Sequence, residues 1–233
     1  MDNLDPTRIP TILGILQEAW EGQSDLTLAQ LWGVLENQGI SWGSSDADIA
    51  AVLQELVRRH PARVSSHGSD IYSVELNSLR EGSYSGSLVV SPEQRTIVVN
   101  RDSGTIPVAW KYSGQPLIQR SRPVRITDRD GNVHVLGIAG LITAYSQPTF
   151  VLNGLIQRNR GGGSWLIELA DGSSVFVGGK LRIAHKGNRS LSVLERTWQV
   201  LGTVEIGEPL RIDGEVYADV EAVWPVSFPR VLD

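Results

Sequence analysis

The sequence predicts a multidomain α+β protein, with an N-terminal helical module followed by an antiparallel all-β barrel or sandwich, or by two small β units. Two observations predict this order. Apolar residues recur at three- and four-residue steps in three segments between residues 7 and 60, which is the period of a helix. From about residue 89, short β-prone runs alternate with Asp-Gly turns. The predicted domains are therefore a helical domain at 1–78, a linker at 79–88 and a β domain at 89–233, with any division of the β domain near 146–190.

The first predicted helix carries a single apolar stripe. Pro10 is compatible with it because proline is tolerated in the first turn. The stripe consists of Ile9, Ile12, Leu13, Leu16 and Trp20.

The second predicted helix has strong local signals at both ends. Thr27 is the expected N-cap, and Gln30 stands three residues later, as a capping box requires. Leu26 and Leu31 have the spacing of a hydrophobic staple, and Gly39 is the expected terminator.

The third predicted helix begins at a serine cap, either Ser44 or Ser45, and stops before Pro61. Asp46 and Asp48 fall in its first turn, where negative charge is favourable against the helix dipole. Its predicted core residues are Ile49, Val52, Leu53, Leu56 and Val57.

After the third helix, residues Arg63 to Leu76 contain two short β-prone runs on either side of Ser66, His67 and Gly68, which predicts a hairpin. Three short helices followed by a hairpin resemble a winged-helix domain, a variant of the helix-turn-helix, over roughly residues 5–77. This resemblance implies a third helix that enters the DNA major groove and a wing that touches phosphates.

The charge of this region opposes binding to DNA. Residues 1 to 80 contain five basic and eleven acidic residues, a net charge of minus six, and an acidic module repels the phosphate backbone. The outward face of the third helix is small and weakly polar, so another protein backbone could approach it closely. We therefore predict a protein-docking face at Ala47, Ala51 and Gln54.

The β region is punctuated by turns. Asp-Gly pairs at 130–131, 171–172 and 213–214 each lie between β-prone runs and predict hairpins, and a further turn is expected at 102–104. The spacing of the three pairs is compatible with a repeated β unit or with an ordinary meander. A short helix is predicted over 191–201, where Ser192 and Glu195 could form a capping box.

Basic residues are concentrated in the middle of the chain. Between Arg95 and Arg196 there are fourteen basic and six acidic residues, a net charge of plus eight, whereas the chain from Thr197 onward has a net charge of minus five. Pairs spaced two apart would project from one face of a strand. Such pairs are candidates for a surface that binds anions or nucleic acid. The competing interpretation is that these charges are solvated or form ion pairs within the chain. The candidate face is Arg120, Arg122, Arg125, Arg158, Arg160, Lys180 and Arg182.

No pattern in the sequence predicts catalysis, a cofactor or a metal site. The four histidines are scattered, and the absence of cysteine excludes thiolate zinc sites, cysteine nucleophiles and disulfides. The first residues resemble neither a secretory signal nor a transit peptide, and a cysteine-free chain is compatible with a reducing compartment, so the expected location is cytoplasmic.

Two functions follow from these patterns. The first is a non-catalytic interaction protein that docks a partner protein, or associates with itself, through the acidic winged helix. The second is a transcription regulator or another nucleic-acid-binding protein that uses the basic β face or the wing. Neither function requires a membrane.

Overall fold

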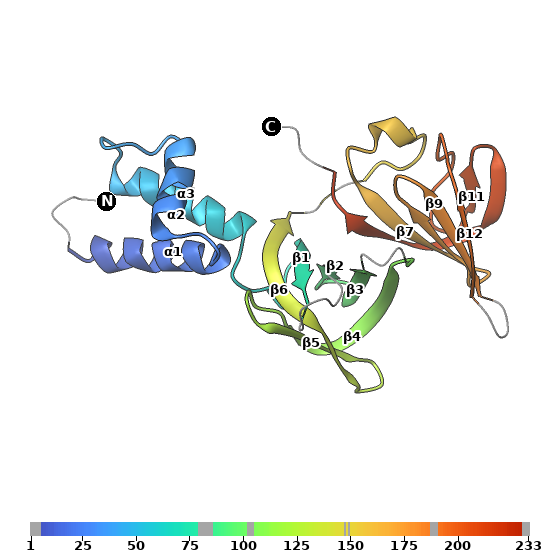
Figure 1. Ribbon diagram of the computed structural model, residues 1–233, viewed down its shortest axis with the longest axis horizontal. Coiled ribbons are helices and arrows are strands. Elements are labelled where there is room, and N and C mark those ends of the chain that lie inside the picture. The colour runs from blue at the N-terminus through green and yellow to red at the C-terminus, as the bar shows by residue number, and fades with distance from the viewer. Residues whose placement is uncertain are drawn as a thin grey trace. The chain divides into compact units, whose positions relative to one another are not determined.

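The computed structural model describes residues 6–78, 86–101, 105–146, 148, 150–186 and 191–229. It is an α+β protein in which three α-helices precede an antiparallel β region (Figure 1). The chain divides into two compact units. The first contains residues 1–85, 91–95 and 112–147, and the second contains residues 86–90, 96–111 and 148–233.

The three helices are α1 (Arg8–Gly22), α2 (Leu28–Asn37) and α3 (Asp46–Arg59). The predicted caps are confirmed: Thr27 and Gln30 form a capping box at α2, and Ser45 forms one with Asp48 at α3. Their shared core is the group of buried residues Ala19, Leu31, Leu35, Ile40, Leu53 and Leu56. All the core residues predicted for α3 belong to or pack against this group.

The first six strands form a closed antiparallel barrel in the order β1 to β6. Its strands are β1 (Ile71–Asn77), β2 (Gly86–Ser91), β3 (Thr96–Arg101), β4 (Val108–Leu117), β5 (Pro123–Asp128) and β6 (Val133–Tyr145). Alternating residues of β1, namely Tyr72, Val74 and Leu76, are buried, as expected for a strand with one face toward a core.

The hairpin predicted over Arg63 to Leu76 is wrong. Ile71–Asn77 pairs with β6, and Arg63 instead forms an isolated bridge with Gln119. The chain does bend at residues 66–69, where Gly68 has a φ of 114°, but the bend leads into the barrel and not back along its own strand. Local turn chemistry was therefore interpreted correctly, whereas the partner of the strand was set by the buried face that β1 presents to the barrel. The resemblance to winged helices rests on the three helices alone.

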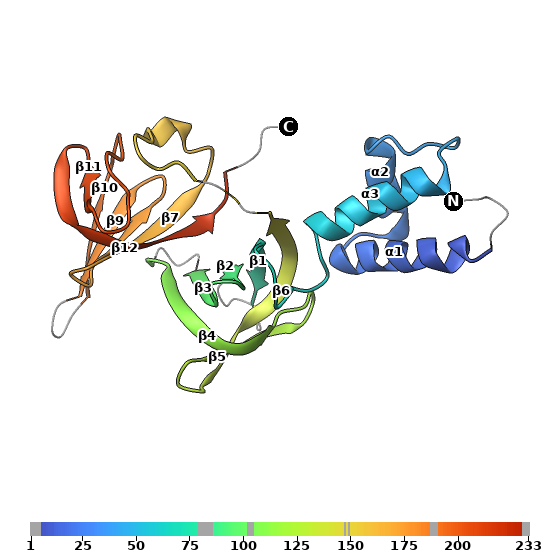
Figure 2. The same ribbon diagram turned by 180° about the vertical axis from the view of Figure 1, so that it is seen from behind.

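The last six strands form a second antiparallel sheet, in the order β10-β9-β8-β7-β12-β11. Figure 2 shows β7 and β12 side by side in it. Its strands are β7 (Ser164–Leu169), β8 (Ser174–Val177), β9 (Leu181–Lys186), β10 (Leu191–Arg196), β11 (Pro209–Ile212) and β12 (Glu215–Ser227), and a 3₁₀ turn η1 (Gln157–Asn159) precedes them. Trp165, Ile167, Val175, Ile183 and Leu210 are among the residues of its core.

All three Asp-Gly hairpins are confirmed, because β5 pairs with β6, β7 with β8 and β11 with β12. After the second hairpin the chain continues into a separate strand, β9, whereas the first and third hairpins end in the long single strands β6 and β12. The turn predicted at 102–104 lies outside the described residues.

The helix predicted over 191–201 is also wrong. Leu191–Arg196 is strand β10 and pairs with β9 in unbroken register. Glu195 lies opposite Arg182 in that register and forms an ion pair with it, in place of a capping box with Ser192. Cross-strand pairing thus outweighs the weak helical periodicity of this segment.

Candidate protein-docking surface

The apolar stripe predicted on α1 is only partly buried. Leu16 packs against the helical core, but Ile9, Leu13 and Trp20 are exposed, with 57% of Leu13 accessible. The buried residues of α1 are Ala19 and Gly22, and Ala19 lies on the neighbouring arc of the helix together with the half-buried Ile15. The apolar surface of α1 is therefore wider than the part of the helix that packs against the core, and one side of this apolar surface faces solvent. We call Ile9, Leu13 and Trp20 the α1 stripe.

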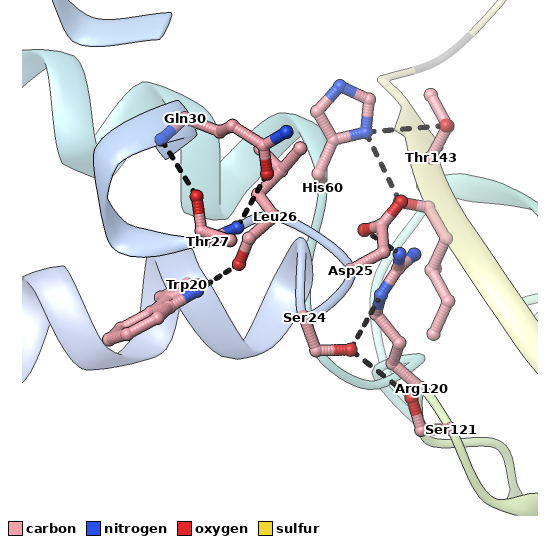
Figure 3. Close-up of polar contacts among 11 residues, drawn as sticks. Trp20, Ser24, Asp25, Leu26, Thr27, Gln30, His60, Arg120, Ser121 and Thr143 are labelled. Carbon is pink, nitrogen blue, oxygen red and sulfur yellow. Dashed lines mark hydrogen bonds and ion pairs between the residues drawn. The ribbon is translucent and has the colours of Figure 1, made fainter. Parts of the chain in front are cut away.

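A second exposed pair lies on α2. Leu28 and Trp32 are four residues apart, hence on one face of the helix, and both are exposed. The indole Nε1 of Trp20 donates a hydrogen bond of 2.7 Å to the carbonyl oxygen of Leu26 (Figure 3), which anchors the end of the α1 stripe to the chain just before Leu28. We call Leu28 and Trp32 the α2 pair. The sequence did place the α1 stripe, but its exposure depends on how α1 is rotated against α3.

The loop between α2 and α3 adds one more aromatic residue. Trp42 is fully exposed. Isolated exposed apolar residues are ordinary, but tryptophan is enriched among the residues that dominate protein interfaces. Three of the seven tryptophans of the chain are thus exposed on the helical module.

Acidic side chains border these apolar residues. Gln17 and Glu21 follow Leu13 at four-residue steps along α1, so they lie close to its side of the helix. The side-chain amide of Gln17 donates a hydrogen bond of 2.8 Å to the Glu21 carboxylate. Glu36 lies four residues after Trp32, and within the described part of the chain it has no ion-pair partner. Residues 6 to 60 contain three basic and seven acidic residues, so the module has a net charge of minus four.

The predicted docking face on α3 is also exposed, at Ala47, Ala51 and Gln54. Of the two acidic residues in the first turn of that helix, Asp46 forms an ion pair with Arg8 of α1. Asp48 accepts hydrogen bonds from the backbone and side chain of Ser45, which lower its pKa. Both carboxylates therefore have structural roles at the start of α3.

Arg120 joins the barrel to the helical module. Its side chain is only 7% exposed, pairs with Asp25 and donates a hydrogen bond of 3.2 Å from Nε to Ser24 Oγ (Figure 3). Its backbone amide donates a hydrogen bond of 2.8 Å to the carbonyl of Ala62. The guanidinium predicted as an anion ligand is thus occupied by a carboxylate of the same chain.

His60 forms a second part of this junction, at the C-cap of α3. Its Nδ1 lies 3.4 Å from the carbonyl oxygen of Ile142 and from Thr143 Oγ1, both on β6 (Figure 3). Because a carbonyl can only accept, Nδ1 carries a proton and donates to Ile142. Burial lowers the pKa of His60 below its usual 6.5, and the positive charges of Arg59 and Arg120 act in the same direction.

The remaining candidate anion ligands are divided between the two units. Arg122 precedes β5 and Arg125 lies on it, and both are exposed in the first unit. The other four belong to the second unit, where Arg158 is exposed and Arg160 donates to the carbonyl of Gly163. Lys180 and Arg182 both bind Glu195.

The strand placement predicted for these pairs is wrong, because only Arg125 and Arg182 lie within strands. Arg120 and Arg122 lie in the connection between β4 and β5, Arg158 lies in η1, Arg160 follows it, and Lys180 lies between β8 and β9.

A cavity of about 610 Å³ lies within the first unit, between the loop before β1, the turn after β2 and the middle of β4. Its lining includes His67, Glu93, Arg95, Tyr112 and Gln115. Burial raises the pKa of Tyr112, which keeps its phenol protonated. The cavity offers hydrogen-bond donors and acceptors, and within its lining the side-chain amide of Gln115 donates a hydrogen bond of 2.6 Å to Ser66 Oγ.

Among the described residues, no cluster of histidine and carboxylate side chains has the composition of a metal site. None of the described helices combines the length and the apolar character needed to cross a membrane. The chain matches no family model, no curated protein and no solved structure.

Proposed function

We propose that this protein is a non-catalytic interaction protein that docks a partner protein on its acidic three-helix module. The observation that carries the proposal is the α1 stripe, three large apolar side chains at helical spacing that the helical core leaves exposed. Exposing such residues in a row costs hydrophobic free energy that their burial against a partner would recover.

The chemistry of the surface favours one kind of partner. The module has a net charge of minus four, and Glu36 lies beside Trp32 with no ion-pair partner among the described residues. An apolar partner segment flanked by lysine or arginine would match both features, because complementary charge speeds and orients association. An amphipathic basic helix has this pattern.

Nucleic acid is the less favoured ligand. Arg120 is bound to Asp25, and Lys180 and Arg182 share Glu195, so these two carboxylates already neutralise two of the seven positive charges of the candidate face. Tight binding to duplex DNA requires several unneutralised cations along one surface.

The test is titration with an amphipathic helical peptide made of lysine and leucine, compared with a peptide in which serine replaces leucine. The readout is the set of NMR amide and indole signals of the module. We expect the leucine peptide to shift the signals of Leu13, Trp20 and Trp32, and the serine peptide to leave them unchanged. In the Leu13→Glu variant, affinity should fall by about tenfold, because the loss of one buried leucine outweighs the added attraction between glutamate and lysine.

The matched control is Val133→Glu, which places the same charge on an exposed apolar residue of β6, outside the helical module. This variant should bind the leucine peptide within twofold of the wild type. Equal affinity of the wild type and Leu13→Glu, or signal changes confined to the β region, would contradict the proposal.

A further inference from the structure

Only one strand edge in the described part of the protein is open. The barrel is closed, so its strands have no free edge, and the second sheet ends at β10 on one side and at β11 on the other. An open edge presents unpaired N–H and C=O groups that can pair with another chain.

The β11 edge is covered by the chain that precedes it. The amide of Gly202 donates a hydrogen bond of 2.8 Å to the carbonyl of Arg211, and the amide of Arg211 donates one of 3.1 Å to Thr203. Pro209 at the start of β11, and a register shift after it, further reduce its capacity to pair.

The β10 edge has none of these protections. Its six residues pair with β9 without a register shift, and β10 contains no proline. On its other side, no main-chain hydrogen bond is formed with any of the described residues. Natural proteins usually guard such an edge with a bulge, a proline or a free charge.

The charged residues of β10 are already bound within the chain. Glu195 accepts hydrogen bonds from Lys180 Nζ at 2.5 Å and from Arg182 Nε at 2.9 Å. Arg196 binds Glu215 at 2.7 Å and the Tyr217 hydroxyl at 2.6 Å. Neither side chain is therefore a free charge that would repel an approaching strand.

The apolar core of the sheet stops abruptly at this edge. Ile183 of β9 is 1% exposed, whereas Leu194, its cross-strand neighbour on the same face, is 54% exposed. Val193, on the opposite face, is also exposed. A further strand beside β10 would cover Leu194 and extend the buried face by one strand.

We propose that two copies of this chain associate by antiparallel pairing of β10 with β10. A two-fold axis through Leu194 would place the two Leu194 side chains opposite each other on the core side of a continuous twelve-stranded sheet, an isologous contact. Charge permits contact between two copies through the nearly neutral C-terminal region, whereas it opposes contact through the acidic N-terminal region. Residues 148 to 233 contain nine basic and ten acidic residues, a net charge of minus one, whereas residues 1 to 78 contain four and eleven, a net charge of minus seven.

Sedimentation equilibrium of the full chain tests the pairing. We expect the wild type to form a dimer at protein concentrations up to about 0.5 mM, and Leu194→Lys to raise the dimer Kd by at least about tenfold, because two lysines would face each other across the axis. Ile206→Lys is the matched control, since Ile206 is an exposed apolar residue of the same unit that lies outside β10. It should leave the dimer Kd unchanged.

Cross-linking provides an independent measurement, because the chain contains no cysteine. Leu194→Cys should form a disulfide-linked dimer on mild oxidation, since opposed residues of an antiparallel pair have Cβ atoms about 5 Å apart. Ile206→Cys should remain monomeric under the same conditions. Circular dichroism of each variant checks that it is folded.

Two outcomes would overturn the proposal. A wild type that stays monomeric over the whole concentration range would show that a second copy does not occupy the edge, and would leave an extended peptide of another protein as the alternative occupant. A dimer that survives Leu194→Lys, with no cross-link at Leu194→Cys, would place the contact elsewhere on the chain.

Discussion

At the scale of single residues, the side chains that join the helical module to the barrel come from distant parts of the chain. Arg120 and Asp25 are 95 residues apart, and His60 and Thr143 are 83 apart. A long side chain that is buried and hydrogen-bonded contributes more than an exposed one of the same charge. Arg120 and Arg122 therefore make a matched pair, two residues apart, with opposite environments.

We expect Arg120→Ala to lower the free energy of unfolding by about 2 kcal/mol, since it removes the ion pair with Asp25, the hydrogen bond to Ser24 and the packing of a buried side chain. The exposure of Asp25 limits the loss, because water solvates its carboxylate once Arg120 is gone. Urea unfolding measures the effect. Arg122→Ala, at an exposed position, should change stability by less than about 0.5 kcal/mol. Equal effects would show that Arg120 is not a junction residue.

His60 makes the junction sensitive to pH. Because the pKa of His60 is lowered in the folded protein, the unfolded chain binds a proton there more tightly. The contribution of His60 is therefore fully present above the usual pKa of 6.5 and is lost as the pH falls below it. His60→Gln, which retains hydrogen-bonding groups without titrating in this range, should show a smaller decrease in stability between pH 7.5 and 5, by comparison of urea midpoints. Parallel pH profiles would contradict this assignment.

At the scale of elements, local chemistry determined the ends of helices and the turns of hairpins. The capping box at Thr27 and the three Asp-Gly turns formed where the sequence predicts them, and Ser45 is the cap of α3, one of the two serines that were expected. Each depends on contacts within about four residues, so neighbouring sequence is sufficient to specify it. The errors at 63–76 and 191–196 concern the strand partner or the type of element, which neighbouring sequence does not specify.

Substitution of two glycines tests the effects of backbone strain and of helix propensity separately. Gly214 has a φ of 85° in the turn between β11 and β12, so Gly214→Ala should destabilise the protein by about 1 to 2 kcal/mol. Gly33 lies within α2, and a Cβ added there would meet no neighbouring atom within 4 Å. Gly33→Ala should therefore stabilise the protein by up to about 1 kcal/mol. In thermal and urea unfolding, the change in stability should be negative for Gly214→Ala and positive for Gly33→Ala. A loss of stability in Gly33→Ala would show that a Cβ at this position of α2 meets neighbouring atoms.

At the scale of the whole molecule, charge is segregated along the sequence, and the charge of each region favours a different kind of contact. The helical module is strongly acidic and exposes apolar stripes, which suits a basic partner and opposes contact between two modules. The C-terminal region is almost neutral, which allows self-association through an open edge. The two proposed contacts use different surfaces, so Leu13→Glu should leave the β10 dimer intact and Leu194→Lys should leave peptide docking intact.

The candidate site could be predicted only in part. The sequence indicated an acidic docking module and gave the α1 stripe by its periodicity, but it pointed to Ala47, Ala51 and Gln54 as the docking face. It gave no sign that Ile9 and Leu13 would be exposed, because a helix with a wide apolar arc can bury either edge. Arg120 was assigned to the same candidate anion face as the exposed Arg122 and Arg125, because sequence spacing does not reveal that Asp25 lies beside Arg120.

The sequence by itself determined that three helices precede a β region, and it determined the helix caps, the Asp-Gly hairpins and the segregation of charge, since these depend on composition or on residues a few positions apart. Only the tertiary structure decided which edge of α1 is buried, that β1 pairs with β6, that Leu191–Arg196 is an edge strand, and that Arg120 is bound to Asp25. These features depend on contacts between residues tens of positions apart, whose free energy is gained only when the chain has folded.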